Sequence, residues 1–189
     1  MALSLRETIL LSAVNHIAAE GPDSLSLRKI AVDAGVSHQA PYHHFEDRRG
    51  LFRAIATEGY EILGDALRSA ARQSSDVRGE AFLDAYVSFA VEHPGHFRVM
   101  FRRDLSEMET SPELRAVADD AFDELVEHVK AEMGPKAPMR EIRARIAGMW
   151  ATAHGLATLL IDGPLEQKIG RITDRRAFVR SVVNQRNQG

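Results

Sequence analysis

Apolar residues recur at three- and four-residue spacing along almost the whole chain, and the alternation typical of strands is absent. Glycine-proline pairs interrupt this pattern at Gly21-Pro22, Gly134-Pro135 and Gly163-Pro164, and such pairs end helices. The pattern predicts an all-α chain of about nine helices with short connections. Their expected ranges are 4–20, 26–34, 38–44, 47–73, a helix between a break at 74–76 and residue 93, then 96–103, 112–133, 138–162 and 174–187.

Composition narrows the class of protein further. The chain of 189 residues contains no cysteine, which excludes disulfides, zinc-thiolate sites and thiol catalysis. Arg6 and Glu7 stand where a signal peptide would need an apolar run, and no apolar stretch approaches the roughly 20 residues of a membrane span. We therefore expect an untargeted, cytoplasmic protein with no membrane partner and no cofactor.

The charge balance limits how the chain could bind nucleic acid. Its formal net charge is -3, and residues 1–50 contain five Arg and Lys against six Asp and Glu. Proteins that coat DNA without regard to sequence usually have a basic surplus, because counterion release drives their binding. Any DNA binding by this chain is therefore expected to be local, through a few placed cations, helix N-termini and base contacts.

Residues 26–45 carry the most informative pattern, which we call the helix-turn-helix segment. It reads as two short helices joined by a turn at Gly35, where a positive φ is cheap for glycine. Ser26 and Ser37 each stand where a helix is expected to begin, so they are predicted N-caps. Free backbone N–H groups at those two ends could meet DNA phosphates.

The second helix of this segment is expected over 38–44 and is unusually polar. Phe45 can anchor its end in the core, while the rest displays hydrogen-bonding groups. Gln39 could bind adenine through paired hydrogen bonds, and Arg28 could bind guanine N7 and O6. A short polar helix anchored at one end suits a major-groove recognition helix.

The segment closely resembles the DNA-binding domain of the TetR family of regulators. The matching residues are Ile30, Ala31, Ala34, Gly35, Val36, Ser37, Tyr42, His44, Phe45 and Leu51. The resemblance implies phosphate contacts from Ser26, Tyr42 and His44, and base-edge contacts from Arg28, His38, Gln39 and Ala40. Together with Ser37, Pro41 and Arg48, these residues form the predicted DNA-binding set.

Two residues depart from the family's pattern. Arg48 stands where a lysine is usual, which keeps the charge but changes the hydrogen-bonding geometry. Pro41 stands where many relatives have leucine or another apolar residue. Proline is tolerable in the first turn of a helix, but here it is expected to change which side chains reach the bases.

The larger C-terminal part is rich in wide, adaptable side chains, which suit a loosely specific apolar ligand site. The candidate ligand residues are Tyr86, Phe89, Phe97, Met100, Phe101, Phe122, Trp150 and His154. Ordinary core packing explains each of them when it is taken alone. Trp150 and His154 lie one helical turn apart, and residues 149–160 resemble the Trp-x-x-x-His-Gly signature of one C-terminal domain class of the family.

Four small residues recur along one face of the predicted helix 138–162: Ala144, Gly148, Ala151 and Gly155. Glycine inside a helix costs about 1 kcal/mol relative to alanine, so two of them suggest close approach of another backbone. Packing within the chain would explain the spacing equally well. The resemblance implies a dimer, so we assign the stripe to a four-helix interface between two copies, formed by the last two predicted helices of each.

Catalytic and metal sites find little support. The chain has no phosphate-cradling glycine loop, no His-Glu-x-x-His and no nucleophile elbow. His38, His43 and His44 point to different faces of a helix, which disfavours a shared metal ion. His93 and His96 stand at a Pro-Gly helix end, where capping and a solvated corner are expected. We predict no enzyme activity and no metal site.

The resemblance implies two parts, a three-helix helix-turn-helix domain over 1–46 and a ligand-sensing and dimerisation domain over 47–189. The expected protein is a transcription repressor that binds a near-palindromic operator in double-stranded DNA as a homodimer and is released by a small-molecule effector. The alternative is a helical small-molecule-binding or metal-binding module, or a hydrolase, without specific DNA binding.

Overall fold

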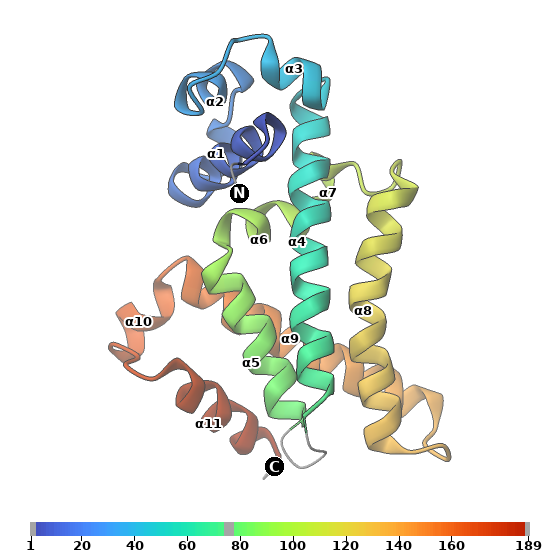
Figure 1. Cartoon of the computed structure of the whole chain (residues 1–189). Coiled ribbons are helices and arrows are strands. Elements are labelled where there is room, and N and C mark those ends of the chain that lie inside the picture. Colours follow the sequence, from blue (N-terminus) through green and yellow to red (C-terminus); the bar gives the residue numbers. More distant parts are fainter. Residues whose placement is uncertain (1–2, 74–77, 188–189) are drawn as a thin grey trace. The chain divides into compact units, whose positions relative to one another are not determined.

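The computed structural model describes residues 3–73 and 78–187, which are helical and contain no strand. The all-α prediction is confirmed. The helices are α1 (Leu5–Glu20), the 3-10 helix η1 (Pro22–Ser24), α2 (Leu27–Asp33), α3 (Ala40–Phe45), α4 (Arg48–Ala71), α5 (Arg78–Glu92), α6 (Pro94–Met100), α7 (Arg103–Ser106), α8 (Pro112–Met133), α9 (Met139–Ile161), α10 (Pro164–Ile169) and α11 (Arg175–Asn187) (Figure 1). None of the described helices is long and apolar enough to cross a bilayer.

The chain divides into two compact units that differ from a simple N- and C-terminal halving. Unit 1 contains residues 1–61 and 93–119, and unit 2 contains residues 62–92 and 120–189. Helices α4 and α8 therefore contribute residues to both units. The predicted boundary at residue 46 separates DNA binding from ligand sensing and does not coincide with these compact units. That functional division stays a prediction.

Within unit 1, local sequence signals set the ends of the first helices. Ser4 forms a capping box with Glu7 at the start of α1, and the Ser26 hydroxyl accepts the Lys29 backbone N–H at the start of α2. Gly35 has a φ of +66° in the turn that follows, a conformation that glycine adopts without steric cost. The predicted Ser26 cap and Gly35 turn are both confirmed.

Helix α3 begins later than predicted, so the expected cap at Ser37 is wrong. The N-cap is Gln39, whose side chain makes no capping hydrogen bond, and Pro41 is the second helical residue. A helix capped by Ser37 would need residue 41 to donate its N–H to the Ser37 carbonyl, and proline has no N–H. The Ala40 N–H donates to that carbonyl instead, at 3.0 Å, which closes a tighter turn before the helix.

Helix α6 connects α1 to α4 within unit 1. Gly95 comes so close to α1 that a Cβ added there would lie 2.3 Å from the Val14 carbonyl oxygen. Arg98 donates to the carbonyls of Ala18 at 2.8 Å and Ile17 at 3.2 Å, which satisfies the C-terminal end of α1. His96 is buried, and its Nε2 lies 2.8 Å from a Glu58 carboxylate oxygen. The predicted solvated corner is therefore wrong, because the close approach at Gly95 draws His96 inside.

Unit 2 is arranged around α5, which packs against α9 and α11. Phe82 on α5 stacks on the His128 ring of α8, with centroids 4.4 Å apart. Asp84 on α5 forms an ion pair with Arg176 on α11, at 3.3 Å. An aromatic stack thus joins α5 to α8, and an ion pair joins α5 to α11.

The described residues contain eleven α-helices, two more than expected. Helix α7 has four residues, too few to show a helical period. Helix α10 begins at Pro164 directly after Gly163, because proline at the first position starts a helix as readily as a glycine-proline pair ends one. The predicted break at 74–76 lies outside the described residues.

Candidate nucleic-acid interface

Six of the ten predicted DNA-binding side chains are exposed on the surface of unit 1: Ser26, Arg28, Ser37, His38, Gln39 and Tyr42. They come from the start of α2, the turn and the first half of α3, so one local stretch of chain positions all of them. Arg28 makes no ion pair with any described residue. An exposed guanidinium, an exposed amide and an exposed phenol offer the donors and acceptors that read base edges.

The opposite side of α3 attaches the helix to the core. Ala40, Pro41 and Phe45 are buried, and the Arg6 guanidinium lies over the Phe45 ring, 5.2 Å from its centroid. Two predicted contact residues, Ala40 and Pro41, thus lie on the supporting face. The apolar residue at position 41 fixes α3 in place, which leaves Gln39 and Tyr42 on the outer face.

The two remaining predicted contact residues are half-buried. His44 lies at the end of α3. Arg48 at the start of α4 donates to the carbonyls of Pro22 at 2.8 Å and Asp23 at 3.2 Å, and its guanidinium lies over the Phe52 ring. Arg48 therefore links α4 to η1. Its neighbour Arg49 is much more exposed and was missed from the sequence. Its place in a pair of arginines shortly after α3 could have identified it as a candidate for a phosphate contact.

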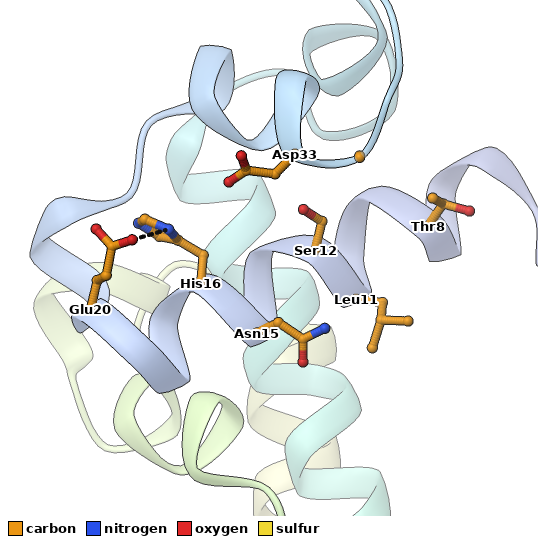
Figure 2. A pocket seen from close by; sticks show the side chains of 8 residues that line it. Thr8, Leu11, Ser12, Asn15, His16, Glu20 and Asp33 are labelled. Carbon is orange, nitrogen blue, oxygen red and sulfur yellow. Dashed lines mark ion pairs between the residues drawn. The ribbon is translucent and has the colours of Figure 1, made fainter.

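A polar cleft of about 500 Å³ lies between α1 and α2 (Figure 2). Thr8, Ser12 and Asn15 line its α1 side, and Asp33 lies across from them on α2. At one end of the cleft Glu20 pairs with His16 at 3.5 Å and with Lys29 at 2.7 Å. None of the predicted ligand residues lines this cleft.

The eight predicted ligand residues fall into two groups. Phe97, Met100 and Phe101 belong to unit 1, where Phe97 and Phe101 are neighbours with ring centroids 5.2 Å apart. The other five belong to unit 2. The structure thus brings together only part of the set within each unit.

Tyr86 and His154 form the polar centre of the unit 2 group. A hydrogen bond of 3.0 Å joins the Tyr86 hydroxyl to Nδ1 of His154. Burial lowers the pKa of His154 below its ordinary value, so the ring is neutral at pH 7. Tyr86 is 6% exposed and Phe89 is 3% exposed, which places these two aromatic rings inside the unit.

Phe122 on α8 and Trp150 on α9 pack edge to face, with centroids 5.4 Å apart, and are among the exposed large apolar side chains. On α9, the predicted interface residues Ala144, Ala151 and Gly155 are exposed, and Gly148 is half-buried. A Cβ added at Gly155 would meet no heavy atom of the described residues within 4 Å. This face of α9 is therefore open within unit 2.

Among the described residues, no group of three or more histidine, aspartate or glutamate side chains could hold a metal ion. What the structure offers instead is a pair of short helices, α2 and α3, joined by a glycine turn, with a buried apolar face and an exposed polar one. Such a pair defines a helix-turn-helix DNA-binding protein.

Comparison with known proteins agrees with this class. The family "Bacterial regulatory proteins, tetR family" matches residues 9–55, and "Tetracyclin repressor-like, C-terminal domain" matches residues 79–185, more than half of the chain. The chain belongs to the TetR family of DNA-binding transcription regulators, which are not enzymes.

Individual relatives match most of this chain. An uncharacterised HTH-type transcriptional regulator of Mycobacterium tuberculosis is 25% identical over 85% of this chain and 72% of its own. The nucleoid occlusion factor SlmA of Vibrio vulnificus is 25% identical over 94% of this chain and 86% of its own. The solved structure of a protein of unknown function from Rhodococcus sp. RHA1 is similar at a TM-score of 0.76 and 29% identity, covering 97% of this chain and 93% of that one.

Proposed function

We propose that this regulator is a cytoplasmic repressor that binds a near-palindromic operator as a homodimer and is released by a small-molecule effector. The observation that carries the proposal is the division of α3 into a buried face, with Pro41 and Phe45, and an exposed face, with Gln39 and Tyr42. Two copies of such a helix would read two half-sites about one helical turn of DNA, or a multiple of it, apart.

In this proposal Arg28, His38 and Gln39 meet base edges, while Ser26, Ser37, Tyr42 and His44 meet phosphates. The buried Ala40 and Pro41 support α3 from behind, and the half-buried Arg48 holds η1 against α4. The net charge of -3 favours binding through a small number of placed contacts.

The experiment is a titration of the purified protein with the intergenic DNA beside its own gene, at about 150 mM salt with excess non-specific competitor. A discrete shift with a footprint of two symmetric half-sites supports the proposal. If neither this DNA nor a selection from genomic fragments yields an enriched palindrome, the proposed operator binding is wrong.

Arg28 and Lys29 offer a matched pair of variants, because they are adjacent on α2 and differ in their partners. Lys29 is already paired with Glu20 at 2.7 Å, whereas Arg28 forms no ion pair within the part of the chain that the structure describes. Arg28→Ala is expected to cost about 1–3 kcal/mol of operator binding for each half-site and to relax specificity at one base pair. Lys29→Ala should change specific affinity much less. Equal losses in the two variants would argue against base reading by Arg28.

We assign the dimer interface to the exposed face of α9 that contains Ala144, Ala151 and Gly155. Ala151→Glu places a charge on that face and leaves the core of unit 2 untouched, since Ala151 is exposed. Light scattering should then report the 21.0 kDa monomer, whereas wild type should show twice that mass. Ala116→Glu, on an exposed part of α8, is the control. A dimeric Ala151→Glu variant would place the interface elsewhere.

The effector site is assigned to unit 2, around Tyr86, Phe89 and His154, with Phe122 and Trp150 nearby. A neutral imidazole and a phenol among aromatic rings suit an apolar or amphipathic molecule. Because Trp150 is the chain's single tryptophan, its fluorescence reports binding without a label. A compound that changes this emission should weaken operator binding about 5–150-fold. Unchanged operator affinity would defeat the release model, even where DNA binding stands.

A further inference from the structure

The start of α4 contains three arginines that have different partners. Arg48 is held by the carbonyls of Pro22 and Asp23. Arg49 and Arg53 both bind Glu107, with Nη1 of Arg49 2.5 Å from Oε1 and Nη1 of Arg53 2.8 Å from Oε2. One carboxylate thus neutralises two guanidinium groups, and all of these residues lie in unit 1.

The backbone holds Glu107 in this position. Its φ of +50° and ψ of +39° are left-handed, a conformation that is sterically unfavourable for a residue other than glycine. The Glu107 carbonyl accepts the Thr110 N–H at 2.9 Å and the Thr110 hydroxyl at 3.1 Å, which fixes the turn after α7. A strained backbone that aims a carboxylate at two cations is an observation from which a function can be inferred.

Arg49 is the member of this cluster that could reach DNA. It lies in the first turn of α4, four residues after Phe45 ends α3. Helix α4 begins beside the end of α3 (Figure 1). The Arg49 side chain is 65% exposed, against 33% for Arg53 and 25% for Glu107. The guanidinium of Arg48, in contrast, is turned toward η1.

We propose that Glu107 is an exchangeable counter-ion for Arg49. In the free protein the carboxylate occupies the Arg49 guanidinium, and on the operator a phosphate oxygen replaces it, while Arg53 stays with Glu107. Only the operator's base contacts hold the DNA backbone where a phosphate can displace Glu107 from Arg49, so DNA of other sequence binds without this contact. Glu107 is thereby a specificity-determining residue. This inference rests on the proposed operator binding.

The test compares Glu107→Gln with Asp104→Asn in binding to a random-sequence duplex and to the selected operator over a range of salt concentrations. Asp104 is on α7 and pairs with Arg102 at 2.8 Å, so its variant has the same change in net charge without releasing Arg49. Glu107→Gln should bind the random duplex about 3–10-fold more tightly near 100 mM salt. On the random duplex its salt dependence should steepen by about one unit of slope, the release expected for one added phosphate contact, while its operator slope should stay that of wild type. Asp104→Asn should keep the wild-type slope.

Arg49→Gln is the second variant, since it tests the exchange even if Glu107→Gln folds poorly. Its operator complex should have a shallower salt slope by about one unit. Arg103→Gln, which changes an exposed arginine of α7, should keep the wild-type slope. The double variant Glu107→Gln/Arg49→Gln should lose the gain in random-duplex binding.

Two results would overturn the exchange. One is a Glu107→Gln protein that is folded by circular dichroism and binds the random duplex with the wild-type affinity and slope. The other is an Arg49→Gln protein with an unchanged operator slope, which would leave Arg49 bound to Glu107 in the complex. Wild-type protein that binds no operator would instead count against the proposed function, so the two failures are distinguishable.

Discussion

The Tyr60 hydroxyl on α4 donates to the Met100 carbonyl at the end of α6, across 3.0 Å in the interior of unit 1. Burial raises the pKa of Tyr60 to about 12. The bond satisfies a carbonyl that α6 leaves without a helical partner. One hydroxyl thus connects two helices through residues that are 40 positions apart in the sequence.

Tyr60→Phe is expected to lower the free energy of unfolding by about 1–2 kcal/mol at pH 7, because the buried Met100 carbonyl loses its donor. Urea denaturation followed by circular dichroism measures the change. Tyr42→Phe, which removes an exposed hydroxyl, serves as the control and should leave stability unchanged.

The same residue also gives stability a pH dependence. The pKa of Tyr60 is higher in the folded state than the value of about 10 in the unfolded chain. Its contribution to stability is therefore fully present below pH 10 and is lost as the pH rises from 10 toward 12. Wild type should lose more stability than Tyr60→Phe across that window. Parallel losses in the two proteins would show that Tyr60 does not contribute to alkaline unfolding.

At the scale of elements, the contact between α6 and α1 depends on Gly95. Gly95→Ala would place a methyl group 2.3 Å from the Val14 carbonyl oxygen and 2.9 Å from its Cγ1. Since the first obstacle is backbone, α6 must move away from α1, at a cost of about 1–3 kcal/mol. Thermal and urea unfolding should both show the loss.

Gly79→Ala on α5 is the matched control for that substitution. The added methyl group would come no closer than 3.9 Å to a described atom, Nε2 of His128, and alanine favours a helix over glycine. This variant should be as stable as wild type or more stable. A Gly95→Ala protein of equal stability would mean that α6 shifts without resistance.

Local signals predicted most of the elements. Ser26 and Gly35 act through neighbours within a few residues, and Pro112 begins α8 as expected. The short α7 and α10 gave no periodic signal, and Pro41 delayed α3 through a missing N–H. For the site, the exposed residues of the helix-turn-helix segment could be named from the pattern. The burial of Ala40 and Pro41 on the opposite side of α3 could not.

Contacts between distant parts of the chain were beyond prediction from one sequence. Arg48 binds the Pro22 carbonyl 26 residues away, His96 meets Glu58 38 residues away, and Glu107 binds Arg49 58 residues away. Each contact is one of many that the sequence would allow, and only the folded structure brings these two partners together. For this reason the role of Arg48 in linking α4 to η1 could not be predicted.

At the scale of the whole molecule, unit 1 is built from two stretches of sequence, residues 1–61 and 93–119. A fragment of residues 1–46 lacks α6, and with it Gly95 and the Arg98 hydrogen bonds that close α1. We expect this fragment to be largely unfolded by circular dichroism and to show narrow amide dispersion in NMR spectra. A well-dispersed spectrum would establish that α1, α2 and α3 fold by themselves.

The discontinuous unit 1 also restricts how such regulators can exchange parts. A recombination event that replaced only residues 1–46 with those of a relative would import a new DNA specificity together with a foreign partner for Gly95, Arg98 and Arg48. Productive hybrids should therefore carry the segment 93–119 from the same parent, so that inheritance of operator choice follows two separate stretches of the gene.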